Sequence, residues 1–376
     1  MVIGKIFHIM FRHGHREPKS GFPTDPNKDT KIWKNGPGHL TILGRQQAYE
    51  FGQNLRARYK TLLPAERAWK AVKAMSSDVP RTLMTCSVVL AGLLPPSNED
   101  QWSELNWQPA AVHTRPTNTD NIIASHPNCP RYDQLLSQIP DKISQETLVL
   151  YNYVRKHSGK KIKSSVALLN LYTCLDIQQQ AGLTLPDWVE PIMRAMKLES
   201  VRSLTKTAKT VELARLRAGP LLQTLTNYEM YPDIPVRLYS THDTVLGGLL
   251  GALNISVDEP PNFVSTLIIE FRELNNQIHA QLWYRSRPKD PLRLINFPGC
   301  DVRCPLNELL KILNPIIPEN WAEECWHEEK VPEILLRHNN PEKNVEQLPL
   351  LVFIKYNLLA VAGNFVRVSL FTFVWK

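Results

Sequence analysis

VIGKIFHIMF (residues 2–11) runs directly into RHGHREP (residues 12–18) near the start of the chain. The first segment is rich in β-branched and aromatic residues. A short, nearly continuous apolar run of this kind is typical of a strand that is buried on both faces, as in a parallel sheet. The basic residues of the second segment then follow the carboxyl end of the strand, which is where open α/β sheets bind their ligands.

The side chains of this second segment suit a phosphate group. Arg12 and Arg16 present planar forks of donors that match phosphate oxygens and never lose their charge. Gly14 has no Cβ, so the backbone can approach a ligand closely or adopt a positive φ. His13, between the arginines, can act as a neutral nucleophile. The alternative is a surface turn whose basic residues pair with nearby acids, but the order of the residues after a buried strand favours the phosphate site.

Apolar runs of strand type alternate along the chain with helical patterns. The strands predicted after the first one cover residues 71–75, 236–240, 264–271, 278–284 and 293–296, and the last three are expected to include antiparallel pairs. Helices are predicted over residues 41–60, from Pro80 to Pro95-Pro96, and through most of 131–227, where the longest apolar face runs from Leu198 to Leu225. This alternation predicts an α/β fold with a mixed, largely parallel central sheet flanked by helices, and with a mostly helical insertion.

The domain organisation follows from the same patterns. The chain has 376 residues, of which 43% are hydrophobic, enough for a substantial core. We assign residues 1–330 to one large domain, in which residues 1–96 and 233–330 form the α/β core and residues 97–232 the mostly helical insertion. Residues 331–376 form a C-terminal tail to which the sequence assigns no definite structure.

The tail contains strongly apolar segments at 350–354 and 358–362, but charged residues interrupt them. Its longest uncharged run, 356–366, is shorter than the roughly 20 apolar residues that a membrane-spanning helix needs. A surface-bound strand, a partial membrane anchor and an artefact of the gene model all stay open for this stretch. Membrane association through the tail is therefore left undecided.

Three motifs resemble those of the histidine acid phosphatases, the acid branch of the histidine phosphatase superfamily, and in particular its animal members of prostatic and lysosomal type. The motifs are RHGHREP at 12–18, SDVPRTL at 77–83 and STHDT at 240–244. The likeness runs from about residue 2 to about residue 330. The resemblance implies hydrolysis of small phosphate monoesters at acid pH through a covalent phosphohistidine, with no metal and no other cofactor. It also implies a homodimer, for which the sequence indicates no interface.

The resemblance assigns a role to each motif residue. His13 is the nucleophile, and Asp243 is first the proton donor to the leaving group and then the base that activates water. The phosphate is held by Arg12, Arg16, Arg81 and His242, the last of these as a hydrogen-bond donor. Taken alone, Arg81 is better explained by a salt bridge with Asp78, and His242-Asp243 by the N-terminal cap of a helix over 244–253. Three motifs in the family's order favour the catalytic assignment.

The expected acid optimum follows from Asp243. A carboxyl group with an ordinary pKa of about 4 is mostly ionised at neutral pH, and nearby arginines lower its pKa further. The protonated acid that the leaving group needs is therefore most abundant at low pH. We expect an optimum below neutrality.

Six cysteines allow many pairings, and neither a CxxC pair nor a zinc-type spacing is present. The family resemblance implies the disulfides Cys129–Cys325 and Cys300–Cys304, and places Cys86 and Cys174 outside the usual pairs. Disulfides indicate an oxidising compartment, so we expect a lysosomal or secreted protein. Because this sequence begins in its first strand, either a signal peptide is missing from it or the protein is cytosolic with reduced thiols.

Two positions of the first motif depart from the family pattern. His15 stands where many relatives have an acidic or polar residue, and Glu17 stands where serine or threonine is more usual. A carboxylate at this place can repel an anionic substrate or tune Arg16. We therefore expect an altered substrate preference with activity retained.

A phytase or a lysophosphatidate phosphatase of the same family would share the catalytic residues. A phosphoglycerate-mutase-like enzyme is disfavoured by Pro18 and by the adjacent His242-Asp243, and a non-catalytic phosphate-binding protein would lack His13 or Asp243. The net charge of +8 is scattered along the chain and no basic stripe with interleaved aromatic residues is present, so we expect no nucleic-acid partner. No carboxylate cluster of metal-binding type is present either.

Overall fold

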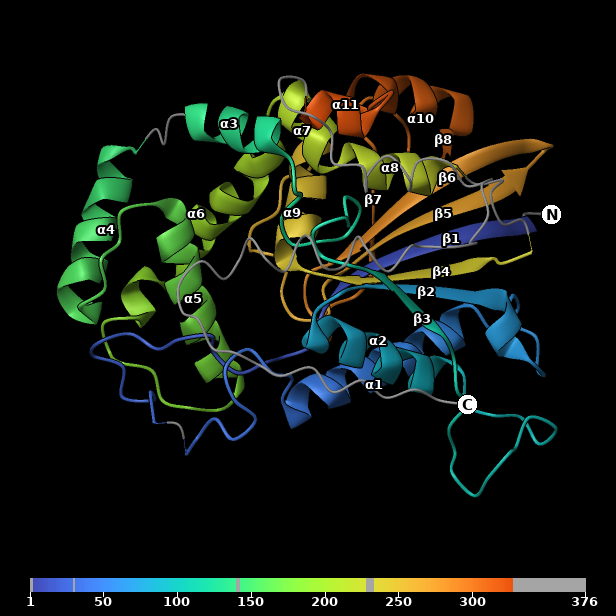
Figure 1. Cartoon of the computed structure of the whole chain (residues 1–376), viewed down its shortest axis with the longest axis horizontal. Helices are drawn as coiled ribbons and strands as arrows, with labels where there is room; N and C mark the ends of the chain where they lie inside the picture. The colour runs from blue at the N-terminus through green and yellow to red at the C-terminus, as the bar shows by residue number, and fades with distance from the viewer. Residues whose placement is uncertain (1–2, 30, 140–142, 228–232, 327–376) are drawn as a thin grey trace, which may run out of the picture. The chain divides into compact units, whose positions relative to one another are not determined.

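The computed structural model describes residues 3–29, 31–139, 143–227 and 233–326 (Figure 1). All of these residues belong to one compact unit, Met1–Val331. The predicted tail, 331–376, lies outside the described residues. Within the described ranges, no helix is long and apolar enough to cross a lipid bilayer.

A mixed eight-stranded sheet forms the centre of the described part of the chain. Its strands are β1 (Ile3–Arg12), β2 (Val72–Ser77), β3 (Val112–Arg115), β4 (Val236–Thr241), β5 (Thr266–Leu274), β6 (Gln277–Arg285), β7 (Arg293–Ile295) and β8 (Cys304–Pro305). Seven of them lie in the order β3-β2-β4-β1-β5-β6-β7, and β8 pairs with β6. The first four are parallel, whereas β5 to β8 add antiparallel pairs. The expected fold class is confirmed.

The first strand is buried on both faces, as its apolar run predicts. Phe7, Ile9 and Phe11 are completely buried against the helices on one face, and Met10 is completely buried in the core on the other. β1 pairs with β4 in parallel, so that Arg12 lies opposite Thr241. Two of the predicted motifs therefore leave the sheet side by side.

Two helices cover the face toward which Phe7, Ile9 and Phe11 point (Figure 1). They are α1 (Ile42–Arg58) and α2 (Pro80–Leu93), and both were predicted from the sequence. α1 begins where the Thr41 side chain accepts a hydrogen bond from Gly44 N, and α2 begins with Pro80 in its first turn. Pro80 directly follows the loop after β2, so the residues of the second motif start a helix at the edge of the sheet.

Helices dominate the middle of the chain, as predicted. They are α3 (Pro130–Gln138), α4 (Gln145–Ser158), α5 (Ser165–Gln180), α6 (Met193–Thr205), α7 (Val211–Arg217) and α8 (Gly219–Thr226). The apolar face predicted from Leu198 to Leu225 is not continuous. The Thr210 side chain caps the start of α7, Pro220 lies in the first turn of α8, and Leu198 and Val211 are exposed. Three short helices thus replace the long one.

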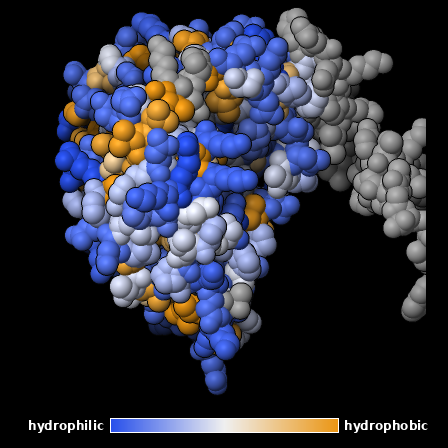
Figure 2. Space-filling model, turned by 90° about the vertical axis from the view of Figure 1, so that its left-hand side faces the viewer, coloured by the Kyte–Doolittle hydropathy of each residue, from blue (hydrophilic) through white to orange (hydrophobic). Residues whose placement is uncertain are grey.

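The second face of the sheet packs against α7, α8 and the helices α9 (Asp243–Ala252) and α10 (Leu306–Leu313). The short helix α11 (Trp321–Cys325) packs beside α3 and α7. Seen from the side of α4 and α5, the surface is mostly hydrophilic, with apolar residues gathered in separate patches (Figure 2). Such patches are ordinary on a domain surface, which always retains much apolar area.

One strand was not predicted. β3 lies within residues 97–232, yet it pairs in parallel with β2 at the edge of the central sheet. Its four residues are only half-buried or exposed, so they lack the continuous apolar pattern of the inner strands. The boundaries of the helical insertion, 97–232, stay a prediction. The strand β3 lies between them but belongs to the central sheet.

The two implied disulfides are formed. Cys129 is bonded to Cys325, and Cys300 is bonded to Cys304. Cys86 and Cys174 are free and buried. The first bridge joins α3 to α11, and the second closes a short loop directly before α10.

Candidate active site

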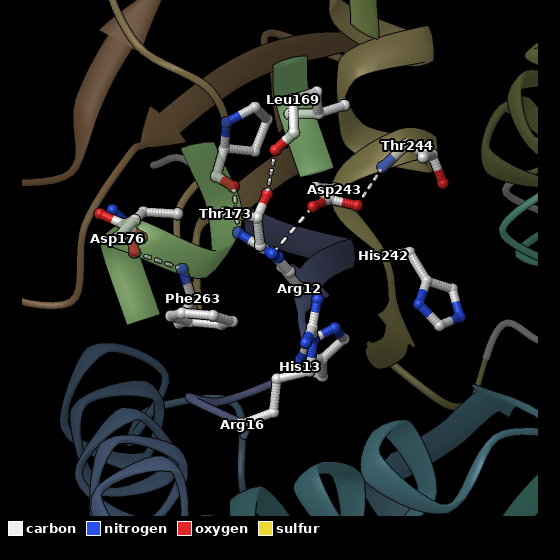
Figure 3. A network of polar contacts seen from close by, with 12 residues as sticks. Arg12, His13, Arg16, Leu169, Thr173, Asp176, His242, Asp243, Thr244 and Phe263 are labelled. Carbon is white, nitrogen blue, oxygen red and sulfur yellow. Dashed lines mark hydrogen bonds and ion pairs between the residues drawn. The ribbon is translucent and has the colours of Figure 1, made fainter. Parts of the chain in front are cut away.

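The three motifs meet at the carboxyl edge of the parallel strands. Arg12 ends β1, Arg81 lies in the first turn of α2 after β2, and His242-Asp243 connects β4 to α9. Because carboxyl ends of neighbouring parallel strands lie at one edge of a sheet, residues up to 231 positions apart in sequence come together here. Figure 3 shows Arg12, Asp243 and Thr244 joined by hydrogen bonds and ion pairs, with His13 and Arg16 nearby.

Arg12 is fixed on three sides. Its Nη2 forms an ion pair of 2.8 Å with Asp243 Oδ2, and its Nη1 donates a hydrogen bond of 2.9 Å to the carbonyl oxygen of Pro261. The guanidinium also stacks over the Phe263 ring at 4.3 Å. Pro261 and Phe263 were not predicted as site residues, because no local pattern connects them to the motifs.

His13 is held as a neutral ring with one free nitrogen. Its Nδ1 lies 2.9 Å from the carbonyl oxygen of Gly14. A carbonyl can only accept, so Nδ1 carries the proton and Nε2 keeps its lone pair. Burial lowers the pKa of His13 well below the ordinary value of 6.5, and Arg12, Arg81, His242 and Arg16 act in the same direction. The lowered pKa favours the neutral ring, which keeps a lone pair on Nε2.

Asp243 carries a charge stabilised by its neighbours. Its Oδ1 accepts a hydrogen bond of 2.9 Å from Thr244 N, and Arg12 pairs with the other oxygen. Burial by itself raises the pKa of Asp243, but Arg12, His242 and Arg16 outweigh it and the net pKa is lowered. The helix-cap interpretation is only partly right, because Asp243 is the first residue of α9 and His242 is the cap.

The remaining two arginines, Arg16 and Arg81, both act electrostatically on His13. Arg16 donates from Nη1 to the carbonyl oxygen of Glu17 at 2.8 Å, and burial, reinforced by Arg12, lowers its pKa to about 10. Arg81 contacts His242, not Asp78, and its Nε is buried without a hydrogen-bond partner. The salt bridge between Arg81 and Asp78 is thus not the arrangement found.

His242 lies against Ser77 and Arg81 in an orientation that the sequence did not predict. Its Nδ1 lies 3.4 Å from Arg81 Nη2, which can only donate, and its Nε2 lies 2.8 Å from Ser77 Oγ. Burial, followed by Arg81, lowers the pKa of His242 to about 3, so the ring is neutral with its proton on Nε2. Both nitrogens contact the protein in this orientation. A donor role toward phosphate stays a prediction.

Gly14 is required by packing. A Cβ on Gly14 would collide with the carbonyl oxygen of Gly44 in α1, and a Cβ on Gly44 would collide with that of His15. The absence of both side chains lets the start of α1 lie directly against the motif. Gly14 N also donates to Thr85 Oγ1 at 3.1 Å, which ties the same loop to α2. Glycine is therefore needed at this position for the close contact with α1. It is not needed for backbone conformation, because the φ of Gly14 is not in the left-handed region.

The two unusual motif residues hold surrounding elements in place. His15 Nε2 donates to the carbonyl oxygen of Ile177 in α5 at 3.0 Å, and its Nδ1 lies 2.8 Å from Thr41 Oγ1 at the start of α1. Glu17 Oε1 accepts hydrogen bonds from Asn35 N at 2.6 Å and from Asn35 Nδ2 at 2.9 Å. Both side chains are buried. Their expected influence on substrate preference stays a prediction. Through these contacts, either side chain would act on the substrate by positioning the neighbouring loop and helices.

The hydrogen bonds of His15 give a testable dependence of stability on pH. Burial lowers the pKa of His15 to about 4, with Arg16 and Arg12 acting the same way and the bond to Ile177 opposing them. Below about pH 6.5 the unfolded chain binds a proton at His15, whereas the folded protein does not bind it until the pH is much lower. The free energy of unfolding therefore decreases as the pH is lowered, by up to about 1.4 kcal/mol per pH unit. In His15→Gln this contribution disappears. Urea unfolding of both proteins between pH 7 and pH 4 should show the weaker dependence in the variant, and equal slopes would contradict the assignment.

Among the described ranges, no group of three or more His, Cys, Asp or Glu side chains is arranged to hold a metal ion. The site instead contains three arginines around His13. Independence from metal is a prediction that the assay below tests.

Known proteins are similar to this chain in both sequence and fold. The family described as histidine phosphatase superfamily (branch 2) matches residues 5–276. Lysosomal acid phosphatase of Rattus norvegicus is 33% identical over 336 residues, which are 84% of this chain and 79% of the relative. Prostatic acid phosphatase of Homo sapiens is 32% identical over 338 residues, 85% of this chain and 87% of the relative.

Solved structures extend the likeness to more distant proteins. The phytase of Citrobacter braakii aligns with a TM-score of 0.66 at 17% identity, covering 86% of this chain and 99% of its own. The Hafnia alvei phytase in complex with myo-inositol hexakis sulphate aligns with a TM-score of 0.66 at 15% identity, covering 85% and 98%. At these identities the structures show a common fold. The family match and the close relatives show more: this chain belongs to the histidine phosphatase superfamily, branch 2.

Proposed function

We propose that this chain is an acid phosphatase that hydrolyses phosphate monoesters through a phosphohistidine on His13. The observation that carries the proposal is the neutral His13 ring, whose Nδ1–H is bound by Gly14 and whose Nε2 is free among three arginines. A neutral imidazole beside permanent cations can attack a phosphorus atom without first losing a proton. Relatives named lysosomal and prostatic acid phosphatase support the same activity.

The proposed reaction has two steps. In the first, His13 Nε2 bonds to phosphorus, the bond from phosphorus to the ester oxygen breaks, and Asp243 gives its proton to the leaving alcohol. In the second, ionised Asp243 takes a proton from water, the water oxygen bonds to phosphorus, and the bond to Nε2 breaks. Arg12, Arg16 and Arg81 balance the charge on the phosphoryl oxygens in both steps. Removal of one such donor typically costs roughly 3–4 kcal/mol in the barrier.

The proposed pH dependence combines two groups. Asp243 must be protonated in the first step, and in the free protein its pKa is held low because Arg12, His242 and Arg16 outweigh the effect of burial. A bound phosphate dianion counters those cations and raises the pKa of Asp243 again. The pKa of His13 is also lowered, by burial first and then by Arg12, which opposes protonation of the nucleophile as the pH falls. Activity should therefore increase as the pH falls below neutrality.

The corresponding assay uses 4-nitrophenyl phosphate and the purified chain from pH 4 to pH 8, with and without EDTA. We expect a maximum below neutrality and equal rates with and without the chelator. A maximum at or above pH 7 would contradict the role of Asp243. Loss of activity in EDTA, restored by a divalent cation, would contradict the metal-free mechanism.

The natural substrate is a separate question. Phytate and lysophosphatidate, compared with simple phosphate monoesters in the same assay, separate the three activities expected of this family. A folded protein that binds phosphate but turns over none of the three would instead be a phosphate-binding protein.

We infer an oxidising compartment, lysosomal or extracellular, for this protein. The bridges Cys129–Cys325 and Cys300–Cys304 support the inference, because disulfides persist in such environments. Relatives named lysosomal acid phosphatase agree with it. The homodimer implied by the family resemblance stays a prediction, which sedimentation of the purified protein can test.

A further inference from the structure

The guanidinium of Arg12 rests on the loop that precedes β5. Its Nη1 donates a hydrogen bond of 2.9 Å to the carbonyl oxygen of Pro261, and its plane stacks over the Phe263 ring at 4.3 Å. Asn262 stands between these two residues in the sequence, so its position determines where both contacts lie. The ion pair with Asp243 holds the guanidinium from another side. The loop and the carboxylate together set the direction in which Arg12 points.

The side chain of Asn262 folds back onto its own loop. Its Oδ1 accepts a hydrogen bond of 2.7 Å from Phe263 N, and its carbonyl oxygen accepts one of 2.9 Å from Ser265 N. Asn262 N donates to the carbonyl oxygen of Ser286, directly after β6, at 3.2 Å. The residue is buried. Asn262 is thus held through its N–H, its carbonyl and its side chain.

The same turn contains a strained residue. The hydrogen bond from Ser265 N to the Asn262 carbonyl closes a turn whose third residue, Val264, has a φ of 55°. Glycine or asparagine usually occupies this position, because a β-branched side chain is crowded at positive φ. A strained backbone persists only where its surroundings enforce it, and it is found most often at functional sites. Here the Val264 N–H donates to the carbonyl oxygen of His13 at 3.3 Å.

A second element holds Asn262 from outside the loop. Gln180, the last residue of α5, donates from Nε2 to Asn262 Oδ1 at 2.9 Å and to Asp176 Oδ2 at 2.8 Å. One amide nitrogen thus divides its two hydrogens between the loop and a buried acid of the preceding helical turn. Asp176 lies on the same side of Arg12 as Phe263 (Figure 3). Burial raises the pKa of Asp176, and Arg12 is the first of the charges that counteract it.

We propose that Gln180 and Asn262 are positioning residues of the catalytic site, which together fix the guanidinium of Arg12 against the substrate phosphate. The inference rests on the proposed phosphatase function and adds two residues that lie outside the three motifs. Their hydrogen bond connects α5 to the carboxyl edge of the sheet, because Arg12 ends β1. Both side chains act on the reaction through Pro261 and Phe263, the two contacts of the guanidinium.

The test measures binding of inorganic phosphate by calorimetry and hydrolysis of 4-nitrophenyl phosphate, both with the purified full chain. Gln180→Met keeps the length of the side chain but cannot donate. Phosphate affinity and kcat/KM should therefore both fall by about threefold to tenfold, the range of one lost hydrogen bond. Asn262→Ala should cause a larger loss, up to about 100-fold in kcat/KM. Gln179→Met is the matched control, because Gln179 is the exposed neighbour on α5, and it should behave as the wild-type protein.

A double-mutant cycle with Arg12 separates positioning from a general loosening of the structure. In Arg12→Ala no guanidinium is left to position, so adding Gln180→Met should change the phosphate affinity by less than about twofold. An equal loss in both backgrounds would overturn the proposal, since it would show that Gln180 acts independently of Arg12. Arg12→Lys serves the same cycle if the alanine variant does not fold, because an ammonium does not reproduce the stacked and forked contacts.

Asp176→Asn separates the chain of hydrogen bonds from the charge of Asp176. This change keeps an acceptor for Gln180, so the phosphate affinity should stay within about twofold of the wild-type value. A loss as large as that in Gln180→Met would assign the effect to the charge and overturn the positioning role.

The phosphate measurements also separate the two possible failures, because binding needs no turnover. If the protein hydrolyses no ester but the cycle with Arg12 gives the expected binding result, the proposed function fails and the positioning of Arg12 stands. If the ester is hydrolysed and Gln180→Met matches the wild-type protein in both kcat/KM and phosphate affinity, the positioning role is wrong and the proposed function stands.

Discussion

Replacement of His13 by alanine is expected to lower phosphate monoester hydrolysis by roughly 10⁴-fold or more, because removal of a covalent nucleophile leaves only binding and charge stabilisation. The variant should still fold and bind inorganic phosphate, since the arginines keep their own anchors: Arg12 to Pro261 and Asp243, and Arg16 to Glu17. Rapid denaturation during turnover of a ³²P-labelled ester should trap label on the wild-type protein and none on His13→Ala. The trapped label should be released by acid and resist alkali, as expected of a phosphoramidate.

His113→Ala is a suitable control, because His113 is an exposed histidine on β3 away from the motifs. It should keep both activity and labelling. Label on His13→Ala would assign the nucleophile to another residue. A fully active and unlabelled His13→Ala protein would exclude a phosphohistidine on His13 and leave direct attack by water.

Replacement of Asp243 by asparagine is expected to divide substrates by their leaving groups. An asparagine keeps the shape of the carboxylate but can neither release a proton to an alcohol nor take one from water. For alkyl phosphates, whose alkoxide needs the proton, hydrolysis should fall by about 10² to 10⁴-fold. For 4-nitrophenyl phosphate the first step should survive and the second should become slow. The result should be a burst of about one nitrophenolate per protein molecule, followed by slow turnover.

The same variant checks the origin of the pH profile. Without a titrating carboxyl at this position, the increase in activity toward acid pH should largely disappear for alkyl phosphates. Thr244→Ala is the matched control, because it removes a neighbouring side chain but keeps the backbone N–H that Asp243 Oδ1 accepts from. An unchanged acid profile in Asp243→Asn, or the absence of a burst, would show that Asp243 is not the acid and base of the reaction.

Local patterns in the sequence were sufficient for the central elements, whereas the roles of the motif residues were predicted through the family resemblance. β1 is an almost unbroken apolar run because both of its faces are covered, and Pro80 identifies the start of α2. The three motifs could be placed together because each follows a strand, and parallel strands present their carboxyl ends at one edge. The convergence of Arg12 with Asp243 needed no knowledge of side-chain contacts.

The features that were missed depend on contacts between distant segments. Phe263 lies under Arg12 although about 250 residues separate them, and nothing near Phe263 in the sequence indicates a ligand site. Ser77 belongs to the second motif, but its hydrogen bond to His242 depends on how β2 and β4 align. The hydrogen bonds from Asn35 to Glu17 were not predicted either, because the two residues are 18 positions apart in a loop without a regular pattern.

The bridge between Cys129 and Cys325 has a consequence for proteolysis. The two cysteines are 196 positions apart and enclose the helices α3 to α11 together with β4 to β8. A single cut anywhere between them leaves both fragments covalently joined, with His13 on the portion before the ring and Asp243 within it. A nicked molecule should therefore migrate as an intact chain on a non-reducing gel and separate into two pieces only after reduction. Proteolytic cleavage between the two cysteines therefore goes undetected in a gel run without a reducing agent, and His13 and Asp243 stay in one covalently linked molecule.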